Sequence, residues 1–225
     1  TRRPTVRIGM PRVLNMYTYA PFFSGYFESL GVLGGNLVYS DFTTNELYRE
    51  GAGRGAIDPC FPAKIGIAHV HNLLFEKHAK KKLDYIFFPM VDTLHTELTH
   101  LQGSNACPTV TVTPETAKAA FIKEGDVFAA NGITYLNPIL NFDQLPLLER
   151  QMFQTWGSPL GLSEEESARA THVGMRELGA FEADIRRRGR EVLDELERGN
   201  RIGIVVLAQW PRPADVAGVA LVFQL

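Results

Sequence analysis

The chain has 225 residues, of which 45% are hydrophobic and 21% are charged, an ordinary composition for a soluble globular protein. Its formal net charge is −2 and its basic runs are short, which argues against a nucleic-acid surface. No segment reaches the roughly 20 apolar residues that a membrane span needs, and two cysteines are too few for a disulfide framework. We therefore expect a cytoplasmic protein. Because the sequence opens on Thr1 rather than Met, we also expect it to begin inside a longer polypeptide.

The first half of the chain alternates short apolar runs with helical patterns. Apolar runs predict strands at 6–10, 36–40 and 84–89, and the last of these is the kind of run that a parallel sheet buries on both faces. Periodic patterns predict helices at 17–30 and 43–51, with Thr43 and Glu46 at capping-box spacing for the second. A further helix is expected to begin at Pro62.

The second half begins with a polar connection at 91–107. A strand is predicted at 109–112, a helix from Thr113 through Phe121, and a small strand at 133–136. The chain turns helical from Phe142, and Ser163 with Glu166 forms a second capping box that opens a helix reaching to about Arg198. An apolar run at 201–207 predicts one more strand.

This alternation predicts a three-layer α/β domain with a mainly parallel, Rossmann-like sheet. We expect the α/β domain at 1–141 and a helical bridge at 142–200. Residues 201–225 are then the first strand of a truncated second α/β unit.

Cys60 is the first candidate functional residue. It stands between two prolines, just before the helix predicted at Pro62. A helix N-terminus favours negative charge, so a thiolate or a metal-bound thiolate would be stabilised there, and Lys64 would add to the effect. A small buried cysteine before a helix is the alternative. Cys107 is the only other cysteine.

Several stretches together resemble the activase-related region of the 2-hydroxyacyl-CoA dehydratase and benzoyl-CoA reductase family. No single motif is specific, but the order of all of them is, across residues 5–207. The matching segments are RIGMPRVLNMY at 7–17, PCFPAK at 59–64, NACP at 105–108, PET at 114–116 and AAF at 119–121.

The resemblance implies ATP-driven delivery of a low-potential electron through iron–sulfur clusters, with ATP bound by a separate activase portion. It implies that Cys60 and Cys107 are ligands of a cluster, of the 4Fe-4S type. Arg12, Lys64 and Asn105 would line the neighbouring cleft, where Arg12 and Lys64 could hold an acidic group such as a phosphate of a CoA ester. The implied partner is the activase portion or subunit, and a dimer is left open.

The chain departs from the family pattern at two places. Met90 stands where some relatives carry another cysteine, and the turn after Leu207 differs from the family's. Two thiolates are too few for a four-cysteine site, so other ligands must come from another chain, a missing segment or a non-cysteine group.

The predicted elements also conflict with a shared site. A cysteine before a helix and one before a parallel strand would lie at opposite edges of the sheet, a strand length of about 17–20 Å apart.

Two further readings remain open. The domain could be a non-catalytic interaction module that docks an activase to its partner, with both cysteines inert. A cysteine-nucleophile hydrolase ranks last, because no motif supplies a histidine near Cys60.

Overall fold

The computed structural model describes residues 3–51, 53, 60–96, 103–206 and 220–222. The strands are β1 (Ile8–Met10), β2 (Leu37–Tyr39), β3 (Tyr85–Phe87), β4 (Met90–Thr93), β5 (Thr134–Leu136), β6 (Ile139–Asn141), β7 (Ile204–Val206) and β8 (Ala220–Val222). The α-helices are α1 (Asn15–Ser29), α2 (Asn45–Gly51), α3 (Phe61–His71), α4 (His78–Lys80), α5 (Pro108–Ile122), α6 (Val127–Ala130), α7 (Leu145–Leu160) and α8 (Glu164–Arg198). Short 3-10 helices η1 (Arg3–Thr5) and η2 (Gly34–Asn36) and the π-helix η4 (Asn72–Lys77) complete them. Of the helices in these ranges, none combines the length and the apolar character that a membrane span requires.

The central sheet confirms the predicted fold class. Its four strands are parallel and lie in the order β2-β1-β3-β5. A second parallel pair, β4 and β6, continues β3 and β5 beyond Pro89 and Pro138. Hydrogen bonds from Phe88 N to Leu136 O (2.9 Å) and from Met90 N to Pro138 O (2.8 Å) join the two ladders. The sequence patterns missed β4 and β6 because a proline precedes each of these short runs.

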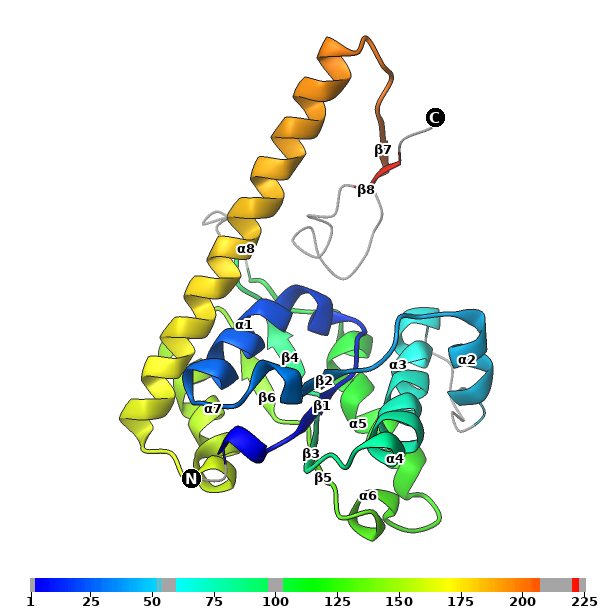
Figure 1. Ribbon diagram of the computed structural model, residues 1–225, viewed down its shortest axis with the longest axis vertical. Coiled ribbons are helices and arrows are strands. Elements are labelled where there is room, and N and C mark those ends of the chain that lie inside the picture. The colour runs from blue at the N-terminus through cyan, green and yellow to red at the C-terminus, as the bar shows by residue number, and fades with distance from the viewer. Residues whose placement is uncertain (1–2, 52, 54–59, 97–102, 207–219, 223–225) are drawn as a thin grey trace.

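Helices cover both faces of the sheet, which gives the three layers (Figure 1). On one face α1, α7 and α8 pack together, and on the other α3 lies against both α2 and α5. Aromatic rings fill the first of these interfaces: Phe27 lies 4.8 Å from Trp156, and Phe23 lies 5.1 Å from Phe87, between ring centroids. The core is therefore centred on β3, between the two helical layers.

The first half of α8 is held against α1. Tyr26 Oη lies 2.9 Å from Ser167 Oγ, and both residues are buried. Arg3 fastens the turn that precedes α8, because it donates to the carbonyl of Leu160 (2.9 Å) and to the carboxylate of Glu166 (2.5 and 3.0 Å). These bonds lower the pKa of Glu166 and raise that of Arg3. Ser163 Oγ accepts from Glu166 N at 3.2 Å, as the predicted capping box requires.

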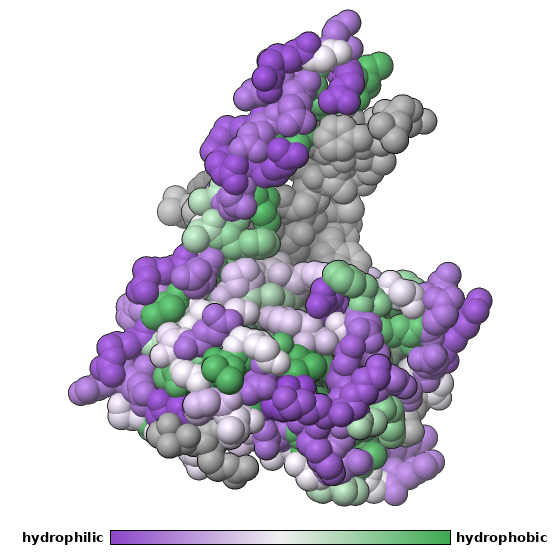
Figure 2. Space-filling view, in the orientation of Figure 1, coloured by the Kyte–Doolittle hydropathy of each residue, from purple (hydrophilic) through white to green (hydrophobic). Residues whose placement is uncertain are grey.

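The second half of α8 extends away from the sandwich, and its surface is mainly hydrophilic (Figures 1 and 2). Exposed ion pairs run along it, including Arg188 with Glu191 at 3.0 Å. After α8, β7 pairs with β8 in an antiparallel ladder. The predicted strand at 201–207 is thus present at 204–206. The second α/β unit, like the three domain boundaries, stays a prediction, and residues 207–219 lie outside the described part.

The prediction of a strand at 109–112 is wrong, because these residues form the first turns of α5. Alternating threonine and valine favours a strand locally, but Pro108 occupies the first helical position, where it is pre-shaped for a helix. The threonine hydroxyls donate to carbonyls one turn back, from Thr113 to Thr109 O at 2.7 Å and from Thr111 to Cys107 O at 3.3 Å. Val110 faces the core, so packing overrides the strand propensity.

Candidate functional site

The candidate site lies at the carboxyl edge of the sheet, where β1 and β3 diverge in their connections. β1 leads through α1 to β2 on one side, whereas β3 leads through α5 to β5 on the other. This change of direction is where open α/β sheets bind their ligands. Three segments meet there: the turn at 11–14, the connection at 40–44, and the N-terminus of α3. The segment 103–107 also reaches this edge through an antiparallel bridge between Thr93 and Asn105.

Both cysteines are exposed and each is the N-cap of a helix, Cys60 of α3 and Cys107 of α5. Both helices are crossovers that run back from the carboxyl edge of the sheet, so their N-termini share that edge. The predicted conflict, which placed the two cysteines at opposite edges, is therefore removed, because its cause was the misassigned strand at 109–112.

The contact between α3 and α5 also shows how far along its helix each cysteine lies. A Cβ added to Gly66 would lie 2.8 Å from Thr113 Cγ2, so the helices touch at these residues. Gly66 is six residues after Cys60, and Thr113 is six residues after Cys107. Six residues of helix span about 9 Å, so each cysteine lies the same distance along its helix from the contact. Packed helices have axes about 8–10 Å apart, so the two cysteines stand at the same level on adjacent helices.

The other predicted binding residues lie around the same edge. The Arg12 guanidinium carbon lies 4.1 Å from the ring centroid of Phe42 and 5.5 Å from that of Tyr39. Its Nε is buried and has no hydrogen-bond partner among the described residues. Lys64 is half-buried in the first turn of α3, and Asn105 is exposed two residues before Cys107. The structure thus brings all five predicted residues to one edge, while their binding roles stay predictions.

A buried chain of hydrogen bonds joins the turn after β1 to the connection after β2. Arg12 N donates to Ser40 Oγ at 2.7 Å, and Ser40 Oγ lies 2.7 Å from His69 Nδ1. On the other side of the imidazole, Nε2 lies 3.0 Å from Thr43 Oγ1. Burial lowers the pKa of His69 to about 4, and the neighbouring Arg12 charge acts in the same direction. His69 is therefore neutral near pH 7.

Sequence patterns missed this chain, and they also misplaced the cap of α2. Thr44, not Thr43, caps that helix, accepting from Leu47 N at 3.1 Å. This leaves the Thr43 hydroxyl to His69. The one sequence signal for its burial is that His69 stands among apolar residues, Ala68 and Val70, and this signal does not reveal its partners.

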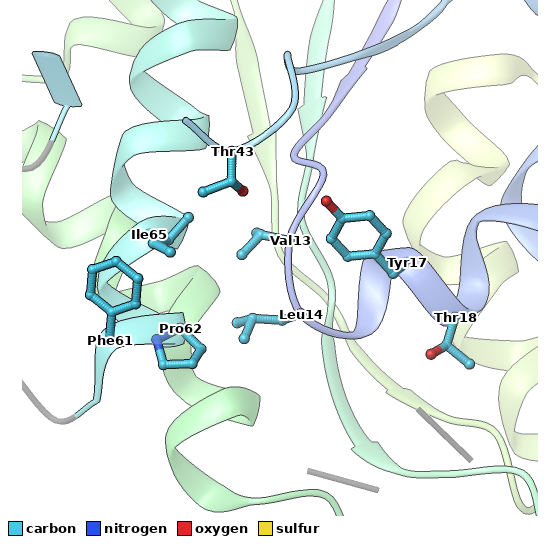
Figure 3. Close-up of a pocket in the computed structure, with 8 residues that line it drawn as sticks. All are labelled: Val13, Leu14, Tyr17, Thr18, Thr43, Phe61, Pro62 and Ile65. Carbon is cyan, nitrogen blue, oxygen red and sulfur yellow. The ribbon is translucent and has the colours of Figure 1, made fainter. Parts of the chain in front are cut away.

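A pocket of about 420 Å³ opens beside these hydrogen bonds, at Thr43 (Figure 3). Leu14, one of its lining residues, has φ 54°, a backbone conformation that non-glycine residues rarely adopt. Such strain clusters at functional sites. The pocket lies between the β1–α1 turn and the start of α3, and its lining residues are Val13, Leu14, Tyr17, Thr18, Thr43, Phe61, Pro62 and Ile65.

Comparison with known proteins places the chain in a family. A family model described as a CoA enzyme activase uncharacterised domain matches residues 7–210. The chain belongs to this family. No curated protein and no solved structure shows significant similarity to it. The match confirms the resemblance to activase-related proteins, and the carboxyl edge described above is the candidate site of this activase domain.

The cysteines of the activase domain fit part of an iron–sulfur site. Thiolates are the normal ligands of such clusters, and both cysteines are exposed at the N-caps of adjacent helices. Among the described residues, however, no group of three or more His, Cys, Asp or Glu side chains could hold a metal ion. A complete ligand set therefore needs residues from elsewhere.

The neutral state of His69 leads to a pH prediction. The unfolded chain binds a proton at His69 below about pH 6.5, whereas the folded protein binds it only near pH 4. The resulting stabilisation is present above pH 6.5 and is lost as the pH falls towards 4, by about 3 kcal/mol in total. Urea unfolding at pH 7.5 and pH 4.5 should show this loss in the wild type and a smaller one in His69→Gln. Equal losses in both proteins would contradict the lowered pKa of His69 as the cause of the pH dependence.

Proposed function

We propose that this activase domain is an iron–sulfur electron-transfer region of an ATP-dependent 2-hydroxyacyl-CoA dehydratase-type system. The observation that carries the proposal is the position of Cys60 and Cys107, exposed at the N-caps of neighbouring helices. In this proposal they hold one cluster together, and the remaining ligands come from another chain or from residues outside the described part. When bound, the cluster supplies one-electron transfer.

The electrostatics of the site support this assignment. Each helix N-terminus presents unpaired N–H groups and a partial positive charge, which stabilise a thiolate and an anionic cluster. Two such ends lie at this edge of the sheet. Lys64, in the first turn of α3, adds a formal positive charge, and the exposure of both cysteines leaves the site accessible to a redox partner.

Arg12 is the second part of the proposal. Its guanidinium is held over two aromatic rings close to the pocket, so little side-chain freedom is lost when it binds a ligand. We propose that Arg12, with Lys64 and Asn105, receives an acidic group such as a phosphate of a CoA ester. The partner in the system is the ATP-hydrolysing activase portion, with a dehydratase component downstream.

Anaerobic reconstitution with iron and sulfide tests the cluster. The wild type should acquire stoichiometric iron and a broad visible absorbance that is bleached on reduction. Cys60→Ser and Cys107→Ser should each lose most of the iron, because each removes a thiolate ligand. Phe61→Leu is the matched control, since it changes the same helix end without removing a ligand, and it should keep the cluster.

The same experiment separates the alternative function. A wild-type protein that stays colourless, with iron near zero, contradicts the cluster proposal and leaves the interaction module with inert cysteines. Retention of the cluster in the double variant Cys60→Ser/Cys107→Ser would instead show that the cluster is held by other residues, and would contradict the ligand assignment alone.

A further inference from the structure

The hydrogen bonds of His69 determine whether the Thr43 hydroxyl donates to the imidazole or accepts from it. Ser40 is 1% exposed, so its O–H proton needs a partner inside the protein. Its oxygen already accepts from Arg12 N. Donation from Ser40 to His69 Nδ1 satisfies that proton and places the imidazole proton on Nε2, which then donates to Thr43 Oγ1. The opposite order would leave the buried Ser40 proton unpaired.

Thr43 is consequently an acceptor towards His69, and its own proton has no partner among the residues that the structure describes. Thr43 is exposed and lines the pocket, so that proton can be donated to a ligand there. Because His69 is fully buried and neutral, this arrangement of protons holds near pH 7. The pocket thus has a hydrogen-bond donor at Thr43, and Tyr17 and Thr18 also contribute hydroxyl-bearing side chains to its lining.

The remaining walls suit an apolar body. Val13, Leu14, Pro62 and Ile65 contribute aliphatic surface, and the rim carries aromatic rings, with Tyr17 51% and Phe61 58% exposed (Figure 3). A ligand that covers these rings removes apolar surface from water. A volume of about 420 Å³ is within the range of small-molecule sites.

We propose that this pocket binds a small uncharged carbonyl compound, with its apolar body between Leu14 and Phe61 and its carbonyl oxygen accepting from Thr43. Ser40 and His69 are positioning residues for the Thr43 hydroxyl. This inference does not rest on the proposed cluster, because no part of it involves the cysteines.

Ligand-observed NMR with acetophenone and ethylbenzene tests the proposal, since the two probes have similar size and differ in the carbonyl oxygen. The iron-free Cys60→Ser protein is used, so that the result is independent of the cluster. Acetophenone should bind about tenfold more tightly, the usual worth of one added hydrogen bond. Thr43→Val should abolish that preference, and Thr43→Ser, which keeps the hydroxyl, should retain it.

Protein-observed methyl NMR supplies the location. Both probes should shift the methyl signals of Val13, Leu14 and Ile65. Absence of those shifts would overturn the pocket as the binding site. An unchanged acetophenone preference in Thr43→Val would overturn the role of the Thr43 donor, whatever happens to the cluster.

Discussion

Replacing Trp156 by alanine should lower the free energy of unfolding by about 3–5 kcal/mol, the usual cost of removing a buried large aromatic side chain. Trp156 is completely buried on α7. Its ring centroid lies 4.8 Å from that of Phe27 and 5.3 Å from those of Tyr85 and Phe87, so it joins α7 to both α1 and β3. Alanine would leave a cavity between the helical layer and the sheet.

Urea unfolding followed by far-UV circular dichroism measures this effect. Trp156→Phe is the control: it keeps an aromatic ring, and it loses no hydrogen bond, since Trp156 Nε1 has no partner among the described residues. We expect a clearly smaller loss for phenylalanine. Equal losses for the two variants would show that the ring packing does not stabilise the interface.

Replacing Gly174 by alanine should also be strongly destabilising, by about 1–3 kcal/mol, because of overpacking. A Cβ at this position would lie 2.7 Å from both the backbone oxygen and the ring Cδ2 of Phe22. The backbone oxygen of α1 cannot move away without moving the helix. The separation of α1 and α8 therefore depends on this glycine.

Gly179 supplies a matched control in the same helix. It is exposed, and a Cβ there would meet no atom within 4 Å. Gly179→Ala should stabilise the protein by about 0.5–1 kcal/mol through helix propensity. Thermal unfolding of the two variants should give shifts of opposite sign. Shifts of the same sign would contradict the close helix crossing at Gly174.

The candidate site owes its composition to the parallel topology. Crossover connections return separate parts of the chain to the same edge of the sheet. The residues brought there in this way are Arg12, Ser40, Thr43, Cys60 and Cys107. The chemistry proposed for this activase domain divides between two adjacent features there. Helix ends carry the cysteines, and the pocket carries the Thr43 donor.

Local patterns were sufficient for much of this architecture. Apolar runs marked β1, β2, β3 and β5, and cap spacing located the start of α8 at Ser163. They also placed Cys60 at a helix N-terminus, because a proline in the first helical turn acts through its own backbone. Such signals are short in range and can be read from neighbouring residues alone.

Tertiary structure decided the rest. At 109–112 a strand-like pattern became a helix, because burial of Val110 and the bond from Thr111 Oγ1 to Val91 O (3.1 Å) outweigh local propensity. That change moved Cys107 to the edge that carries Cys60. The bonds of His69 to Ser40 and Thr43 likewise join residues 29 and 26 positions apart in the sequence, respectively. Contacts between distant segments leave no periodic signal in the sequence. The site could therefore be recognised only from the folded sheet, which brings these segments to one edge.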